Sequence, residues 1–257
     1  MKKVFSFFKL AARSSIYKVL VLFGITFLIQ AVLFGIAAAV SGPDAGFEEI
    51  LYKSRLQAAA GIALIVVCIV LSLPWRRGAA ANPHLMLART AGKSTGAAYG
   101  ILVYNICVIF MFWVVQLTGV IILSTLYLKI TGSGNMMSGL FLACWRNGYF
   151  HTLLPLSDVW RIFRNAAMVL MLGIVSAAMG FAAEPLKWTG LVLAAAVAFR
   201  YAGFEAGSPF YEGICIVLSL AIGIIWYILL INACKKGDEP DKRGGSWDVK
   251  PEEGGTL

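Results

Sequence analysis

The tetrapeptide Gly92-Lys93-Ser94-Thr95 is the stretch whose residue types and spacing come closest to a reactive site. It matches the closing half of a phosphate-binding P-loop, which also needs a glycine five positions before the one preceding the lysine. Leu87 occupies that position. The residues leading into the tetrapeptide hold prolines and an arginine pair rather than the β-branched run of a strand. We therefore expect no nucleotide-binding site and no cofactor in this chain.

Other reactive side chains are sparse. The two histidines, His84 and His151, fall in loops on opposite sides of the predicted membrane, without a paired acid or a serine–histidine arrangement. The five cysteines show no CxxC or other metal-ligand spacing, and most lie in apolar runs, as expected of small buried hydrophobes. The sequence thus predicts neither an enzyme nor a metal site.

Composition places the chain in the membrane. Hydrophobic residues make up 60% of the sequence and charged residues only 14%, whereas about a quarter of the residues in soluble domains are charged. The net charge of +9 would raise nucleic acid as a partner for a soluble protein. In a membrane protein the distribution of charge matters more than its sum, so we expect a lipid bilayer and no nucleic acid as partner.

Six apolar runs are candidates to cross a hydrocarbon layer. The predicted fold is an all-α polytopic membrane protein, with a six-helix transmembrane domain over residues 16–234 and an N-terminal amphipathic interfacial helix. The first run is longer than the apolar core of a cleaved signal peptide, which favours a retained anchor. The runs lie at about 19–40, 57–73, 97–128, 166–183, 186–202 and 211–233.

Lysine and arginine are distributed unevenly about these six spans. One side holds fifteen: five in the N-terminal arm, four in the 74–96 loop, one at Lys187 and five in the tail. The other side holds seven. Since positive charge stays in the cytoplasm, we predict a multi-pass protein of the cell membrane with both termini cytoplasmic. The apolar segment 136–155 would leave Arg146 in the membrane if it spanned, so we expect an interfacial or re-entrant helix on the outer face.

The two ends of the chain differ in character. Residues 1–15 separate lysines from phenylalanines on a helical wheel, which predicts an amphipathic helix in the cytoplasmic interface or a simple topology signal. Residues 235–257 mix both charge signs with glycine and proline, which predicts a disordered cytoplasmic tail.

The third predicted span carries polar side chains that need partners within a bundle. Asn105, Gln116 and Thr118 are the candidates, either as contacts between helices or as contacts to a transported molecule. The central parts of the first four spans contain no ionisable residue. This absence argues against a proton- or sodium-coupled carrier, which usually keeps such a group near the midplane.

The amphipathic arm, the six spans with both ends inside, the long third span and the polar cytoplasmic connection after span two together resemble the type-2 permeases of ATP-binding-cassette transporters. The resemblance covers about residues 1–234. It implies an exporter permease that pairs with a second permease subunit (homo- or heterodimer) and with cytosolic ATPase subunits. ATP hydrolysis would then belong to the partner.

The family places a short ATPase-docking helix between spans two and three, and the corresponding residues here are about 83–93. Leu85, Met86 and Leu87 would form its apolar face, while Arg89 and Lys93 would supply charges for the partner. An ordinary basic cytoplasmic loop is the alternative. Two other functions also stay open: a non-transporting accessory, immunity or sensor subunit, and a secondary carrier or channel.

Overall fold

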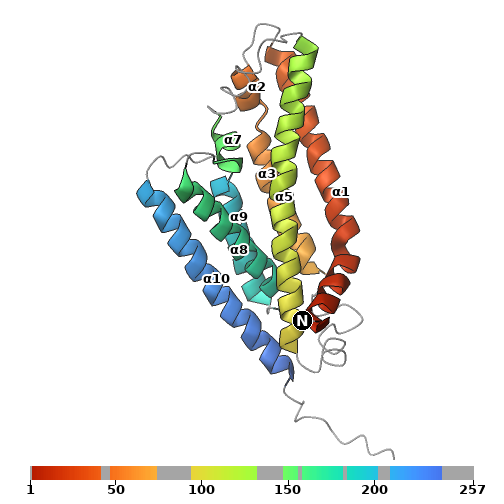
Figure 1. The fold of residues 1–257 in the computed structure, drawn as a ribbon, viewed down its shortest axis with the longest axis vertical. Coiled ribbons are helices and arrows are strands. Elements are labelled where there is room, and N and C mark those ends of the chain that lie inside the picture. The colour runs from red at the N-terminus through yellow and green to blue at the C-terminus, as the bar shows by residue number, and fades with distance from the viewer. Residues whose placement is uncertain are drawn as a thin grey trace, which may run out of the picture.

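The structure is a computed structural model that describes residues 2–41, 47–73, 94–131, 147–155, 158–181, 184–201 and 209–238. Within these ranges the chain forms helices and no strands, which confirms the predicted all-helical class (Figure 1). With the labels of Figure 1, the helices are α1 (Lys2–Ser41), α2 (Phe47–Lys53), α3 (Leu56–Ser72), α5 (Ser94–Thr131), α7 (Gly148–Leu153), α8 (Val159–Phe181), α9 (Glu184–Tyr201) and α10 (Pro209–Asp238).

Four of these helices, α1, α5, α8 and α10, are long and apolar enough to cross a membrane. A fifth candidate is the pair α2 and α3, which is bent by 40° where Arg55 takes a left-handed conformation with φ of 47°. The apolar part of α9, Lys187–Val197, is shorter. The described residues thus contain four or five candidate spans, in keeping with a membrane protein.

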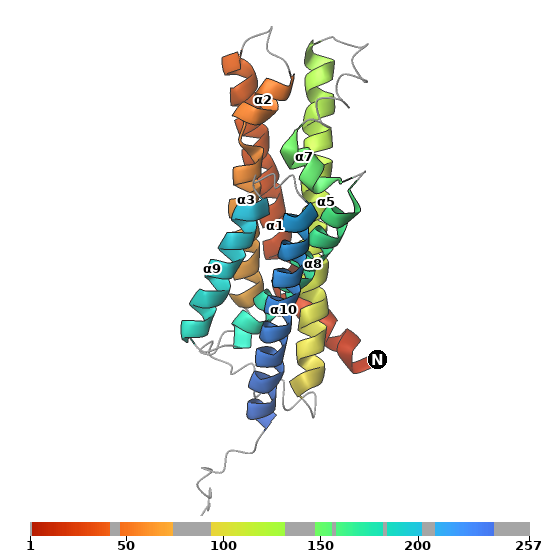
Figure 2. The ribbon, with the colours of Figure 1, turned by 90° about the vertical axis from the view of Figure 1, so that its left-hand side faces the viewer.

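The long helices alternate in direction along one bundle. Figures 1 and 2 show α1, α5 and α9 running one way and α3, α8 and α10 the other. The start of α1, the start of α5 and the end of α10 therefore share one end of the bundle, here named the basal end. The opposite end, where α2 and α7 lie, is named the distal end.

Helix α1 joins the predicted N-terminal arm and the first predicted span without a break. The hydroxyls of Ser14 and Ser15 both donate to the carbonyl of Ala11, so these serines remain inside the helix by bonding to its preceding turn. Phe7 and Ala11 are buried, and the ring of Phe8 meets that of Tyr104 edge-on at 5.6 Å. Part of the arm's apolar face therefore packs on α5, where we expected it to enter the acyl boundary of the bilayer.

The start of α8 differs from the predicted one because the apolar run stops at charged residues. Helix α8 begins at Val159, seven residues before the predicted span 166–183, and it includes Arg161 and Arg164. The short helices α2 and α7 lie outside all predicted spans. Of the predicted outer segment 136–155, the structure describes 147–155, which contains α7. Residues 136–146 and 239–257 lie outside the described part.

Apolar side chains gather in two clusters. The main core surrounds α8. In the most apolar stretch of α8, 67% of the residues are buried, against 22% in that of α10. A Cβ atom on Gly173 of α8 would lie 3.1 Å from the backbone Cα of Ile106 and still closer to its side chain, so glycine permits the close approach of α5. The distal core unites α1, α2, α3, α5 and α7 through Phe34, Ala37, Ile50, Leu51, Leu56, Ala60, Val120, Leu123, Tyr149, Phe150 and Leu153.

Candidate functional site

Three polar side chains meet between the two cores. Gln30 of α1 donates from Nε2 to Oε1 of Gln116 on α5 at 2.6 Å and to the carbonyl of Leu56 at 3.4 Å. The hydroxyl of Tyr149 on α7 donates to the same Oε1 at 3.1 Å. All three side chains are buried. One glutamine oxygen therefore ties together α1, α5 and α7.

Burial governs the chemistry of Tyr149. It raises the pKa of the Tyr149 phenol well above its ordinary value, because the charged phenolate would lose its hydration. The group therefore remains a neutral donor. Its hydrogen bond to Gln116 is available over the whole physiological pH range.

A buried ion pair joins α8 to α10. Nη1 of Arg164 lies 2.8 Å from both carboxylate oxygens of Glu212, and these side chains are only 5% and 2% exposed. Nε and Nη2 of Arg164 donate to Oδ1 of the neighbouring Asn165 at 3.3 and 3.1 Å. A buried charge is tolerated only when a counter-charge and further hydrogen bonds satisfy it, and this arrangement meets both conditions.

Helix α7 connects the ion pair to the glutamine pair. Nδ2 of Asn165 donates to the carbonyl of Thr152 at 2.7 Å. Nη1 of Arg161 lies 2.5 Å from Nδ1 of His151, and Asp158 holds Arg161 by an ion pair of 3.1 Å. Asp158 also caps α8 by accepting from the backbone N–H groups of Trp160 and Arg161.

These contacts form one polar layer across the distal half of the bundle. We use the name polar layer for the side chains that carry it, namely Gln30, Gln116, Tyr149, His151, Asp158, Arg161, Arg164, Asn165 and Glu212. It links α1, α5, α7, α8 and α10. Because water is scarce within a packed membrane bundle, such groups must satisfy one another, and the layer fixes the relative register of these helices.

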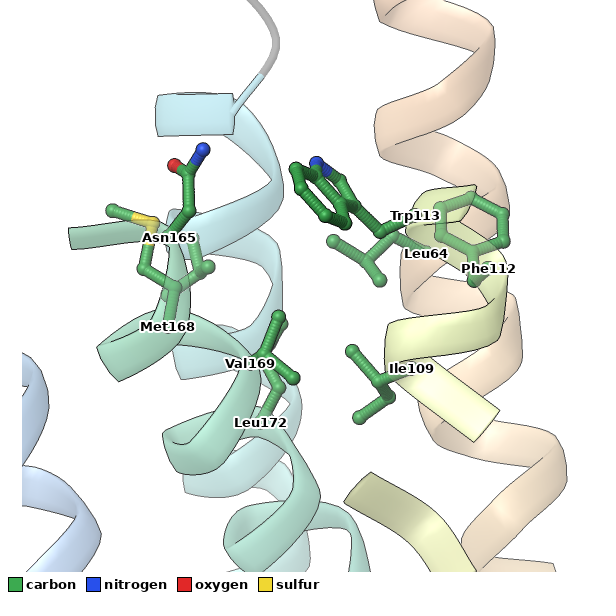
Figure 3. A pocket seen from close by; sticks show the side chains of 9 residues that line it. Leu64, Ile109, Phe112, Trp113, Asn165, Met168, Val169 and Leu172 are labelled. Carbon is green, nitrogen blue, oxygen red and sulfur yellow. The ribbon is translucent and has the colours of Figure 1, made fainter. Parts of the chain in front are cut away.

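A small cavity lies beside the polar layer. Its volume is about 30 Å³, and Leu64, Ile109, Phe112, Trp113, Asn165, Met168, Val169, Leu172 and Val197 line it. Figure 3 shows the α5 side chains, Trp113 among them, facing those of α8 across this space. The indole N–H of Trp113 is buried and, among the described residues, without a hydrogen-bond partner. The cavity has room for about one water molecule, far less than a ligand pocket of roughly 300 Å³ or more.

The three polar residues predicted on the third span lie in different surroundings. Asn105 is buried and donates from Nδ2 to the hydroxyl of Ser176 on α8 at 3.0 Å. Gln116 belongs to the polar layer. Thr118 is exposed, and its hydroxyl donates to the carbonyl of Val114 in the same helix. Two of the three are thus contacts between helices, while the third faces outward.

The predicted docking residues, Leu85, Met86, Leu87, Arg89 and Lys93, lie outside the described residues. The helices on either side of them are described. Helix α3 ends at Ser72 and α5 begins at Ser94, both at the basal end (Figure 2). The 83–93 segment therefore joins two helix ends that share the end of the bundle where α1 begins.

The polar layer includes residues that the sequence did not single out as a site. Arg161 and Arg164 belong to the seven lysines and arginines predicted on the outer side, and Glu212 lies at the start of the last predicted span. The spacing of Arg161 and Arg164 could have indicated a shared site, because side chains three residues apart lie on the same face of a helix. An acidic residue within an apolar run should also have a buried counter-charge. Nothing in the sequence pairs Glu212 with Arg164 rather than with another arginine.

Comparison with known proteins gives no relative: the chain matches no protein-family model, no curated protein and no solved structure.

Proposed function

We propose that this chain is the transmembrane permease subunit of an ATP-driven exporter of the ATP-binding-cassette type. It would have six membrane spans, α2–α3 counting as one bent span and α9 as a short one, and both termini in the cytoplasm. A separate cytosolic ATPase would bind the 83–93 segment, and a second permease subunit would complete the transporter. The chain itself would neither bind nor hydrolyse ATP.

One observation carries the proposal: the alternating helix directions bring the basic N-terminal arm, the end of α3, the start of α5 and the end of α10 to the basal end (Figure 1). Fifteen of the 22 lysines and arginines belong to segments on this side of the six-span arrangement. Such a bias is typical of a cytoplasmic face. The arrangement supports a cytoplasmic position for the 83–93 segment, which an ATPase needs in order to bind it.

A double substitution tests the docking segment. Leu85→Ala with Leu87→Ala removes the apolar side chains that would enter a groove of the ATPase, and truncating such an interface residue can cost roughly 2 to 4 kcal/mol. The full-length protein is expressed in its native cells and purified with its associated proteins, and ATPase activity is measured in the purified material. We expect the variant to lose the co-purifying ATPase while its own membrane insertion is unchanged.

The matched control is Leu140→Ala with Leu142→Ala, which removes the same side chains from the segment predicted on the outer face. This control should retain the ATPase. If both double variants retain it equally, the 83–93 segment is an ordinary connection. If the unmodified protein purifies without any ATPase, the exporter proposal itself fails.

The polar layer favours a second candidate, a non-transporting accessory or sensor subunit. Its buried contacts tie α1, α5, α7, α8 and α10 together, which suits a bundle that holds one arrangement. Such a protein would purify without an ATPase and would still respond to its surroundings. The co-purification experiment therefore separates the two candidates.

A further inference from the structure

Helix α7 bridges two groups of helices at the distal end. On one side, Tyr149 donates to Gln116, and the buried Phe150 and Leu153 pack in the distal core with α1, α2 and α5. On the other side, the carbonyl of Thr152 accepts from Asn165, and His151 contacts Arg161 of α8. A helix of only six residues thus carries polar contacts to both groups.

The contact between His151 and Arg161 requires an uncharged imidazole. An arginine side chain has donors only and does not lose its proton in proteins. Nδ1 of His151, at 2.5 Å from Nη1 of Arg161, must therefore be the acceptor. A protonated imidazole has donors at both ring nitrogens, so protonation removes the acceptor and brings two positive charges together.

The surrounding charges determine where the Arg161 side chain turns when this contact breaks. From the start of α8, Arg161 contacts the histidine and Asp158 pairs with Arg161, with Arg164 one turn further along. From α10, Glu212 pairs with Arg164, and its Oε1 lies 4.0 Å from Nε of Arg161. On the α5 side of α7, the described polar groups are the neutral amide of Gln116 and the neutral phenol of Tyr149, which bond to each other. Arg161 therefore has two carboxylates to turn to when it leaves His151.

We propose that α7 is a pH-sensitive strap, which the neutral His151 fastens to Arg161 of α8 and which protonation of His151 releases. The transferred proton comes from solvent and occupies Nδ1, the atom that accepts from Arg161 at neutral pH. The α5 side of the strap remains attached through Tyr149 and the distal core. On the α8 side the hydrogen bond from Asn165 to the carbonyl of Thr152 does not depend on His151, so acid loosens α7 from α8 without releasing it, and leaves its contacts with α1 and α5 intact.

The strap does not depend on the proposed transport function, because a sensor subunit would use the same device. His151 lies at the distal end, which the charge distribution predicts to face outward. Histidine is the side chain whose charge ordinarily changes within the range from about pH 5 to pH 8. The strap would therefore respond to the external medium and leave the basal end unaffected.

Hydrogen exchange of the full-length protein in lipid nanodiscs tests the proposal. The reporters are two backbone bonds of α7, from the N–H of His151 to the carbonyl of Asn147 at 3.0 Å and from the N–H of Leu154 to that of Phe150 at 2.8 Å. Exchange is measured at pH 7.5 and pH 5.0 and corrected for the intrinsic rate at each pH. We expect the opening of these bonds to rise roughly tenfold or more in acid, as for the loss of a hydrogen bond to a charged group.

Substitutions at the two histidines make the test specific. His151→Gln keeps an acceptor for Arg161 that does not protonate, so the pH response should vanish; His151→Asn serves if that variant does not fold. His151→Lys carries a permanent charge and should exchange fast at both pH values. His84→Gln removes the other histidine and should keep the response of the unmodified protein. An unmodified protein with equal opening at both pH values, or a His151→Gln variant that still responds to acid, would overturn the proposal.

Discussion

Arg164 and Glu212 form a buried ion pair between α8 and α10, with Nη1 of the arginine 2.8 Å from both carboxylate oxygens. They are 48 residues apart in the sequence, yet they lie where both helices begin. Asn165 accepts two further hydrogen bonds from the guanidinium and itself donates to the carbonyl of Thr152 on α7. The pair thus anchors one end of the polar layer that crosses the bundle.

Removing one partner of this pair should destabilise the protein strongly. Glu212→Leu removes the carboxylate that Nη1 of Arg164 contacts, and breaking a buried ion pair by removing one partner typically costs about 3 to 5 kcal/mol. Arg164→Met combined with Glu212→Leu should cost much less, because neither charge of the pair remains. Denaturant unfolding of the purified protein in detergent measures both.

The control for this prediction is the exposed pair Lys53–Glu49, whose side chains are 46% and 54% exposed. Glu49→Gln should change stability by less than about 1 kcal/mol, as is usual for exposed ion pairs. A Glu212→Leu variant as stable as Glu49→Gln would show that Arg164 finds water or another partner.

Gln116 should matter more than either of its partners. Gln116→Leu removes the acceptor that Gln30 and Tyr149 share, and the loss of a buried hydrogen-bond partner costs about 1 to 3 kcal/mol. Tyr149→Phe removes one donor and leaves the bond between the glutamines, so its cost should be nearer 1 kcal/mol. Unfolding midpoints rank the two variants. Thr118→Val, two residues along the same helix but exposed, should be close to neutral, and an equal loss in all three would refute a special role for Gln116.

The all-helical class and the positions of several helices were predictable, because apolar runs depend on local composition. The third predicted span, 97–128, lies within α5, and the second, 57–73, nearly coincides with α3. The start of α8 was not predictable in this way, since its first turns contain Arg161 and Arg164. A span predicted from hydropathy ends where a charged residue such as Arg164 occurs. In the structure, Glu212 from a distant segment pairs with Arg164, so the helix can include it.

The different surroundings of Asn105, Gln116 and Thr118 on α5 have a related physical cause. A polar residue within an apolar helix indicates a need for a partner, but it does not say whether the partner is another helix or the helix's own backbone. Asn105 and Gln116 have long enough side chains to reach neighbouring helices, and they contact α8, α1 and α7. Thr118 can bond to the carbonyl four residues before it, so it can remain exposed to lipid.

Glycine substitutions should separate close helix packing from helix propensity. In Gly173→Ala the new Cβ would meet both the side chain and the backbone of Ile106, and overpacking of this kind typically costs about 1 to 3 kcal/mol. In Gly35→Ala the new Cβ meets nothing within 4 Å, so the variant should gain up to about 1 kcal/mol from helix propensity. Thermal unfolding of both variants is the measurement. A Gly173→Ala variant as stable as Gly35→Ala would contradict the α5–α8 packing.

Single cysteines in a cysteine-free protein should report the orientation of the bundle. Lys53 on α2 and Lys235 near the end of α10 are both exposed and lie at opposite ends of the bundle (Figure 1). With both termini in the cytoplasm, Lys53→Cys should react with an impermeant maleimide added to intact cells, and Lys235→Cys should react only after the membrane is permeabilised. The reverse pattern would place the 83–93 segment outside and remove it from any cytosolic ATPase.

Helices α1 and α5 run in the same direction and contact each other from Ser15 with Tyr104 to Phe34 with Tyr127. Because they are parallel and α3 lies between them in the sequence, α1 and α5 cannot pair as a helical hairpin during synthesis. While the ribosome is still making α3, the buried amide of Gln30 has neither Gln116 nor Tyr149 to bond with, and the first helices must wait in the bilayer incompletely satisfied. Biogenesis of this protein should therefore depend on membrane chaperones that shield α1 until the third long helix has been inserted.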